Sequence, residues 1–118
     1  MSKNLEMVYL IDAYSSALTE KQRDMLELYY CEDLSLAEIA QNSGISRQGV
    51  RDCIKRGEAA MLELEDTLGL ARRNRLLSEV FEGIRSRAEE IIEQNDAFEI
   101  KRLAGEIIEK TAVLEGGA

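Results

Sequence analysis

Three helix-start signals lie close together in the first half of this 118-residue chain, and they constrain its fold more than any other feature. Thr19 is followed three residues later by Gln22, and Ser35 by Glu38. This is the capping-box pattern, in which each side chain bonds the backbone N–H of the other residue. Ser46 provides a third residue of the N-cap type. Caps at such short intervals predict short helices with defined ends.

The rest of the chain is also patterned for helices. Apolar residues recur at spacings of three and four, proline is absent, and no stretch alternates strictly between β-branched and polar residues. Apolar residues make up 45% of the chain and charged residues 32%, which is typical of a globular protein rather than a disordered one. We therefore predict an all-α fold.

Caps, glycines and apolar stripes set the expected helix bounds. The predicted helices span about 4–17, the Thr19 cap to Asp33, the Ser35 cap to Gly44, the Ser46 cap to Gly69, 70–93, and the Asp96 cap, with Glu99 three residues on, to Gly116. Residues 1–69 then form a helix-turn-helix bundle, with the motif at about 35–57. Residues 70–118 form long carboxyl-terminal helices, packed on the same domain or making a dimer contact.

A heptad-like seam runs along the helix expected at 70–93. Its apolar residues alternate spacings of four and three, which is the pattern of a helix that packs against a partner along its length. The seam predicts packing on the last helix of the same chain together with a contact between two copies in a homodimer. It consists of Leu77, Phe81, Ile84, Ala88 and Ile91.

Residues 36–55 fit the template of a helix-turn-helix, in which two helices lock together around a glycine-bearing turn. Ala40 falls where the two helices approach closely, and Gly44 falls where the turn favours positive φ. Ser43 is the one weak fit, because that position is commonly apolar. The residues expected at inward sites are Ile39, Ile45, Val50, Cys53 and Ile54, and those on the same face further along are Gly57, Met61, Leu64 and Leu68.

Helical geometry then turns a polar set outward on the second helix of the motif. Arginine can bond guanine O6 and N7 together, glutamine can do the same to adenine, and a helix N-terminus suits a phosphate oxygen. An ordinary antiparallel helix pair with solvated charges is the alternative. The predicted nucleic-acid-binding residues are Ser46, Arg47, Gln48, Arg51, Lys55 and Arg56, with Asp52 also outward.

The overall charge limits how nucleic acid could be bound. The formal net charge is -8, and neither half of the chain has a positive excess. Proteins that bind phosphates generally carry such an excess, because neutralising phosphates releases counterions. Any binding to double-stranded DNA must therefore depend on a local group of cations. The carboxyl-terminal cluster of Arg72, Arg73 and Arg75 is interpreted as a solvated helix face rather than an extension of the phosphate-contacting surface.

Several function classes receive no support from the residues. The chain has no histidine, and Cys31 and Cys53 are far apart with no CxxC pairing, so we expect no metal site, no cofactor and no enzymatic activity. The cysteines are interpreted as buried or inert thiols. No long apolar segment is present, which predicts a cytoplasmic protein without membrane insertion. The tyrosines, interpreted as core or boundary residues rather than base-stacking groups, are Tyr9, Tyr14, Tyr29 and Tyr30.

Three segments closely resemble region 4 of bacterial sigma factors, namely 18–28 (LTEKQRDMLEL), 33–40 (DLSLAEIA) and 44–51 (GISRQGVR). The resemblance covers about residues 18–60 and implies a sigma-region-4-like helix-turn-helix. The sequence departs from the sigma pattern at three positions of the reading helix, where Gln48, Gly49 and Asp52 replace a frequent glutamate, arginine and glutamine. These replacements argue against recognition of a promoter -35 element.

The whole chain, including the opening block 5–14 (LEMVYLIDAY), resembles the YlxM family of small bacterial helix-turn-helix proteins. The resemblance implies a DNA-binding regulatory protein associated with the signal recognition particle pathway. An alternative is an acidic adaptor that binds the particle's GTPase or its RNA without reading a specific DNA sequence. A third reading is a structural dimer whose helix-turn-helix has lost recognition.

Overall fold

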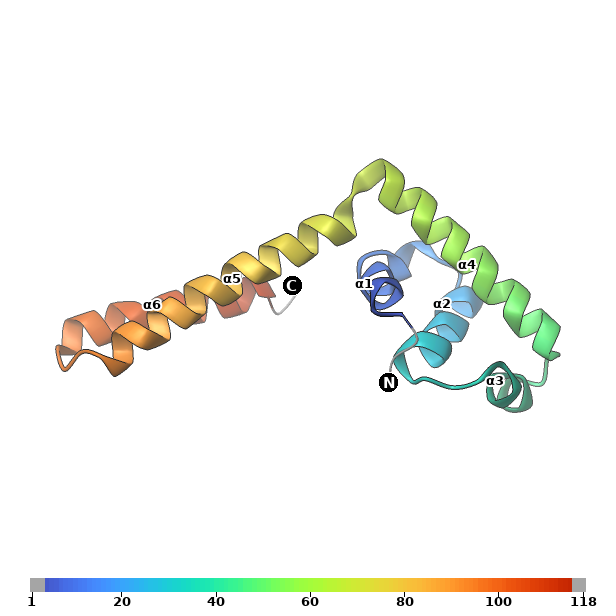
Figure 1. Ribbon diagram of the computed structural model, residues 1–118, viewed down its shortest axis with the longest axis horizontal. Coiled ribbons are helices and arrows are strands. Elements are labelled where there is room, and N and C mark those ends of the chain that lie inside the picture. The colour runs from blue at the N-terminus through green and yellow to red at the C-terminus, as the bar shows by residue number, and fades with distance from the viewer. Residues whose placement is uncertain (1–3, 116–118) are drawn as a thin grey trace. The chain divides into compact units, whose positions relative to one another are not determined.

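A computed structural model describes residues 4–115, and nearly all of them are helical (Figure 1). No strand occurs in this part of the chain, so the all-α prediction is confirmed. Two short helical turns supplement the α-helices, a 3-10 turn at Ser15–Ala17 and a π-helical turn at Glu27–Cys31. The α-helices are α1 (Leu5–Tyr14), α2 (Glu20–Leu26), α3 (Leu36–Ser43), α4 (Arg47–Leu68), α5 (Leu70–Glu93) and α6 (Phe98–Glu115).

The predicted caps begin three of these helices. The Thr19 hydroxyl accepts from the Gln22 backbone N–H at 3.1 Å, and the Gln22 side chain accepts in return from the Thr19 N–H at 3.2 Å. Ser35 and Glu38 form the same reciprocal pair at 3.1 and 2.9 Å. Ser46 caps α4, which ends at Gly69 with φ 61°. Both capping boxes and the Ser46 cap are confirmed.

Three helix ends differ from the prediction. α1 stops at Tyr14 rather than near residue 17, because the chain tightens into a 3-10 turn in which the Leu18 N–H bonds the Ser15 carbonyl at 3.2 Å. α2 passes into the π-helical turn, which no local pattern had indicated. α6 begins one residue later than an Asp96 cap requires, since the Lys101 N–H bonds the Ala97 carbonyl. The predicted stop at Gly116 lies outside the described residues.

The first of two compact units, which divide at the Arg73–Asn74 bond, is built around α4. α1, α2 and α3 all pack on this helix. Gly57 in α4 allows the closest approach, because a Cβ atom at that position would lie 2.6 Å from Leu26 Cδ1. Leu68 was predicted on the inward face but is 62% exposed, since it ends α4 beyond the last buried turn. The core residues with almost no exposed surface are Leu26, Ile39, Val50 and Met61.

The second unit contains most of α5 followed by α6, and the two helices run back along one another as a hairpin (Figure 1). Ala88 of α5 and Ala104 and Thr111 of α6 are its most buried residues. These small side chains permit close packing of the two helices. Within residues 4–115, no helix is both long enough and apolar enough to cross a lipid bilayer.

Candidate nucleic-acid interface

The turn between α3 and α4 has the geometry that the helix-turn-helix template requires. Gly44 ends α3 in the left-handed conformation, φ 77°, and its N–H bonds the Ala40 carbonyl at 3.0 Å. Glycine adopts this conformation without the steric cost that a Cβ atom imposes. Ser46 is extended, and its hydroxyl accepts from the Gly49 N–H at 3.0 Å, so that α4 begins at Arg47. The left-handed Gly44 and the Ser46 cap therefore set the direction in which α4 leaves the turn.

The inward side of the motif is apolar, as predicted. Ile39 and Val50 have no exposed surface, and Ile54 is buried beside them. The remaining inward residues Ala40, Ile45 and Cys53 are half-buried and pack against the same core. Because α3 and the first turns of α4 share this core, the orientation of α4 relative to α3 is fixed by packing as well as by the turn.

The predicted binding residues all lie on the exposed side of α4 or at its start. Arg47, Arg51 and Lys55 are four residues apart, which places their side chains in one row along the helix. Among residues 4–115 none of these three cations has a side-chain hydrogen bond or ion pair, so each is available to an external anion. The exposed residues at these positions are Ser46, Arg47, Gln48, Arg51, Asp52, Lys55 and Arg56.

One polar pair on this surface was not foreseen. The Gln48 Nε2 amide donates to Asp52 Oδ1 at 3.0 Å, one helical turn further on. The contact leaves the Gln48 carbonyl oxygen and one amide N–H for an external partner and holds the side chain against the helix. Asp52 also places a negative charge beside Arg51, which lowers the affinity of this surface for phosphate.

A small cleft lies beside the cation row, lined by side chains of α4 and the π-helical turn. It has a volume of about 290 Å³, and Arg51 and Lys55 form part of its wall. The Tyr30 hydroxyl donates a hydrogen bond to Glu58 across it. Burial and this carboxylate raise the pKa of Tyr30 above its ordinary value. Tyr30 is thus an anchored core residue, and Tyr29 is half-buried with its ring edge-on to that of Tyr30.

A second network joins α1, α4 and the start of α5. The Glu65 carboxylate accepts from the Tyr14 hydroxyl at 2.6 Å and from the Ala71 and Arg72 N–H groups at 2.9 and 3.2 Å. The Tyr14 oxygen itself accepts from the Leu70 N–H at 3.0 Å. Glu65 and Tyr14 therefore satisfy the first free N–H groups of α5. No local sequence pattern indicates this pair, because its members are 51 residues apart.

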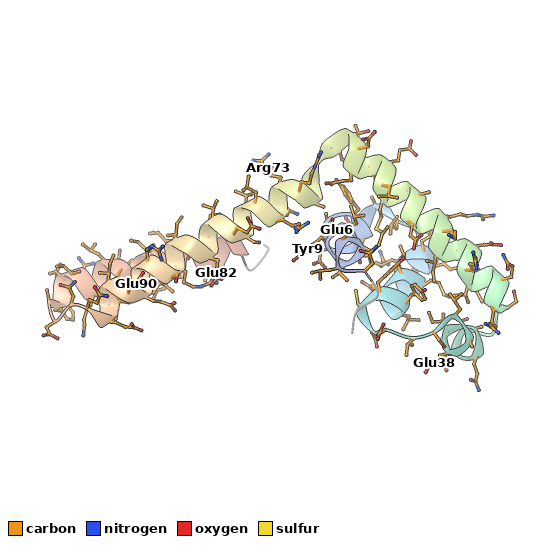
Figure 2. The ribbon with its side chains drawn as sticks, viewed as in Figure 1. Glu6, Tyr9, Glu38, Arg73, Glu82 and Glu90 are labelled. Carbon is orange, nitrogen blue, oxygen red and sulfur yellow. The ribbon has the colours of Figure 1, made fainter. Side chains whose placement is uncertain are left out.

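The carboxyl-terminal arginines divide between structural and solvated roles. Arg72 bonds the Glu65 carboxylate through Nε at 3.3 Å, although its side chain is 75% exposed. Arg73 extends from α5 into solvent (Figure 2), and Arg75 is half-buried and has its own polar interaction. At least two members of this cluster therefore interact within the chain, and the interpretation as a solvated helix face stays a prediction.

The two cysteines are free thiols in different environments. Cys53 is half-buried in the motif, whereas Cys31 is exposed, so of the two thiols predicted to be buried or inert Cys31 is not a buried one. Partial burial and the nearby carboxylates of Asp12, Glu27 and Glu32 raise the pKa of the Cys31 thiol. A raised pKa disfavours the thiolate, which is the reactive form. Among residues 4–115, no three His, Cys, Asp or Glu side chains are grouped closely enough to hold a metal ion.

Comparisons with known proteins agree with this geometry. A sequence model of a family described as "Putative helix-turn-helix protein, YlxM / p13 like", UPF0122, matches residues 1–104. A UPF0122 protein of Halalkalibacterium halodurans is 46% identical over 85 residues, which are 72% of this chain and 78% of the relative. One of Clostridium kluyveri is 44% identical over 84 residues, 71% of this chain and 76% of the relative. One of Thermoanaerobacter sp. is 40% identical over 103 residues, 87% and 88% of the two chains.

Proposed function

The chain belongs to the UPF0122 family of YlxM / p13-like helix-turn-helix proteins, and from this membership we propose that it is a regulatory protein that binds double-stranded DNA. The observation that carries the proposal is the row formed by Arg47, Arg51 and Lys55, which is exposed and unpaired within the described chain. The row begins at the helix N-terminus that follows the turn. In DNA-binding helix-turn-helix proteins this end of the second helix enters the major groove.

The roles proposed for the side chains follow from their chemistry. Arg47 and Gln48, in the first turn of α4, contact base edges, and Arg51 reaches a base or an adjacent phosphate. Lys55 and Arg56, further along the helix, bind phosphates as flexible positive groups. The Ser46 hydroxyl is engaged by the Gly49 N–H, so Ser46 contributes chiefly by capping the helix whose N-terminus faces a phosphate. The Gln48–Asp52 contact occupies one Gln48 amide N–H and keeps a carboxylate on this surface, which lowers its affinity for DNA. Recognition therefore depends on few residues.

Selection from a random duplex library at low salt tests the proposal. We expect one sequence to be enriched, and we expect the double substitution Arg47→Ala and Arg51→Ala to weaken binding to it about 100-fold, since each arginine–base contact is worth roughly 1–3 kcal/mol. The matched control removes two exposed cations elsewhere, Lys21→Ala and Lys101→Ala, and should change affinity only slightly. Failure to enrich any sequence would sink the proposal.

The second candidate function is an acidic adaptor in the signal recognition particle pathway, binding the particle's GTPase or its RNA. The net charge of -8 favours the binding of a protein with a basic surface, because opposite charges attract, but it does not favour the binding of RNA, which is itself negatively charged. The signal recognition particle pathway is inferred only from the resemblance to the YlxM family. Purified protein can be tested for capture by the GTPase, its receptor and the RNA separately. Binding to none of the three would remove this candidate and leave the DNA proposal standing.

We also assign the chain a cytoplasmic location and no enzymatic activity. Histidine, the commonest general base near neutral pH, is absent from the sequence. Two carboxylates that contact tyrosines, Glu58 and Glu65, are hydrogen-bonded within the fold. Their contacts support a structural use of these groups.

A further inference from the structure

The hairpin of α5 and α6 has one apolar side that the hairpin itself does not cover. Helices α5 and α6 meet along their small and half-buried residues, among them Ala88 and Ala104. Next to this contact, each helix carries a further row of aliphatic residues at three- and four-residue spacing. Together they form what we call the open face, whose members are 39–52% exposed: Leu77, Val80, Ile84 and Ile91 of α5, and Ile100, Leu103 and Ile107 of α6.

Both rows lie on the same side of the hairpin. A groove between the helices is lined by Val80, Ile84 and Ile91 from α5 and by Ile107 from α6. Helical geometry places the other members of the open face in line with these residues, because Leu77 and Ile100 lie seven residues from Ile84 and Ile107, and Leu103 lies four residues from Ile107. The opposite side of α5 carries polar residues, including Glu82 and Glu89. The unit is thus a two-helix layer with one apolar surface and one polar surface.

We propose that a second copy of this chain covers the open face, so that two hairpins pack as a four-helix bundle. The face exposes on the order of 500 Å² of apolar surface, close to the largest patch that a monomer normally carries. With its polar edges it approaches the roughly 800 Å² that each partner contributes to a stable interface. When the open faces of two hairpins pack together, their apolar residues at heptad-like spacing form the kind of core that four-helix bundles have.

The charges at the edges of the open face suit a second copy. Arg87 stands at the edge on α5, where it pairs with Glu90 at 3.2 Å, and Glu106 stands at the edge on α6, where it pairs with Arg102. These surface pairs remain solvent-accessible. Arg87 and Glu106 lie at similar heights, because Arg87 lines the same groove as Ile107. A two-fold axis parallel to the helices brings α5 of one copy opposite α6 of the other. Arg87 of each copy then lies near Glu106 of the second copy, and the contact closes upon itself.

The dimer goes beyond the DNA-binding proposal and does not depend on it. If DNA binding also holds, each copy brings its own α4, and a dimer carries two reading helices. Such proteins bind sites with two related halves. Mass measured without DNA tests the dimer alone, and duplex selection tests recognition, so the failure of either proposal is distinguishable from the failure of the other.

Sedimentation equilibrium of the full chain at roughly 50 µM tests the proposal, since interfaces of this size usually associate at micromolar concentrations or tighter. We expect twice the chain mass of 13.3 kDa. Ile84→Glu and Leu103→Glu should each convert the protein to a monomer with unchanged helical circular dichroism, because these side chains are 41% and 52% exposed. The matched control is Phe98→Glu, which replaces an apolar residue 75% exposed and half a turn away from Ile107 about α6.

The control variant should remain a dimer. A wild-type monomer at this concentration would overturn the proposal and leave the open face to a different partner. A dimer that survives both Ile84→Glu and Leu103→Glu would overturn the assignment of the interface to this face. Circular dichroism separates loss of association from loss of folding, and loss of helical signal in one variant leaves the other to decide.

Discussion

At the scale of single residues, Glu65 has the most defined role outside the candidate interface. Burial opposes its ionisation, but hydrogen bonds from the Tyr14 hydroxyl and from the Ala71 and Arg72 N–H groups outweigh it and hold the pKa of the carboxyl below its ordinary value of 4.5. A carboxyl whose pKa is lower in the folded state contributes stability that is present above the unfolded pKa and is lost as the pH falls through the folded value.

This pKa shift gives a prediction about acid stability. In the wild type, the urea midpoint of the helical signal should decrease as the pH falls below about 4.5, in part because Glu65 must be protonated. Glu65→Gln should already have a lower midpoint at pH 7 and a weaker dependence on pH in that window. Glu109→Gln, an exposed carboxylate of α6, serves as the control. Identical acid profiles for wild type and Glu65→Gln would contradict the role given to this carboxylate.

At the same scale, the individual residues of the interface were predictable only in part. The outward positions of Arg47, Arg51 and Lys55 follow from helical periodicity once Val50 and Ile54 are placed inside. The Gln48–Asp52 contact, in contrast, depends on side-chain rotamers that periodicity does not determine. The Tyr14–Glu65 and Tyr30–Glu58 pairs join distant segments, so no local pattern could reveal them.

At the scale of helices, the contact between α2 and α4 gives the sharpest prediction. Gly57→Ala gains up to about 1 kcal/mol of helix propensity, but the new Cβ atom must displace the fully buried Leu26. Overpacking of this kind typically costs about 1–3 kcal/mol. We therefore expect Gly57→Ala to lower the free energy of unfolding by about 1 kcal/mol, measured by urea denaturation.

The contrasting substitution is Gly105→Ala in α6. Gly105 has open space where its Cβ atom would lie, so alanine adds helix propensity without a clash. Its hairpin should become more stable by up to about 1 kcal/mol. If Gly57→Ala raised the free energy of unfolding as Gly105→Ala does, the close approach of α2 and α4 would not be the reason for glycine at position 57.

Helix existence was more predictable than helix ends. Thr19, Ser35 and Ser46 marked three helix starts, because a capping side chain bonds backbone groups only two or three residues away. The end of α1 and the π-helical turn at Glu27–Cys31 depend on how these segments meet α4, which is a tertiary property. The start of α6 was misplaced by one residue, where an aspartate resembled a cap but the chain entered the helix at Ala97.

At the scale of the whole molecule, the distribution of charge decides what can be bound. The chain carries 23 acidic and 15 basic residues, so long-range forces repel a polyanion. Binding to DNA therefore depends on the short-range row on α4, and it should be weak at physiological salt unless two copies act together. The DNA-binding proposal and the dimer proposal are connected here, because a dimer carries two α4 helices and the second one raises the affinity for the same duplex.

The most direct test of the central claim, that α4 binds DNA through its exposed cations, is the salt dependence of affinity for an enriched duplex. If about four phosphates are neutralised by each chain, the slope of log affinity against log salt should be near -4 per chain. The double substitution Lys55→Ala and Arg56→Ala, at the two residues proposed to bind phosphates, should reduce the magnitude of that slope by about 2. A flat salt response, or an equal slope in wild type and double variant, would contradict the claim.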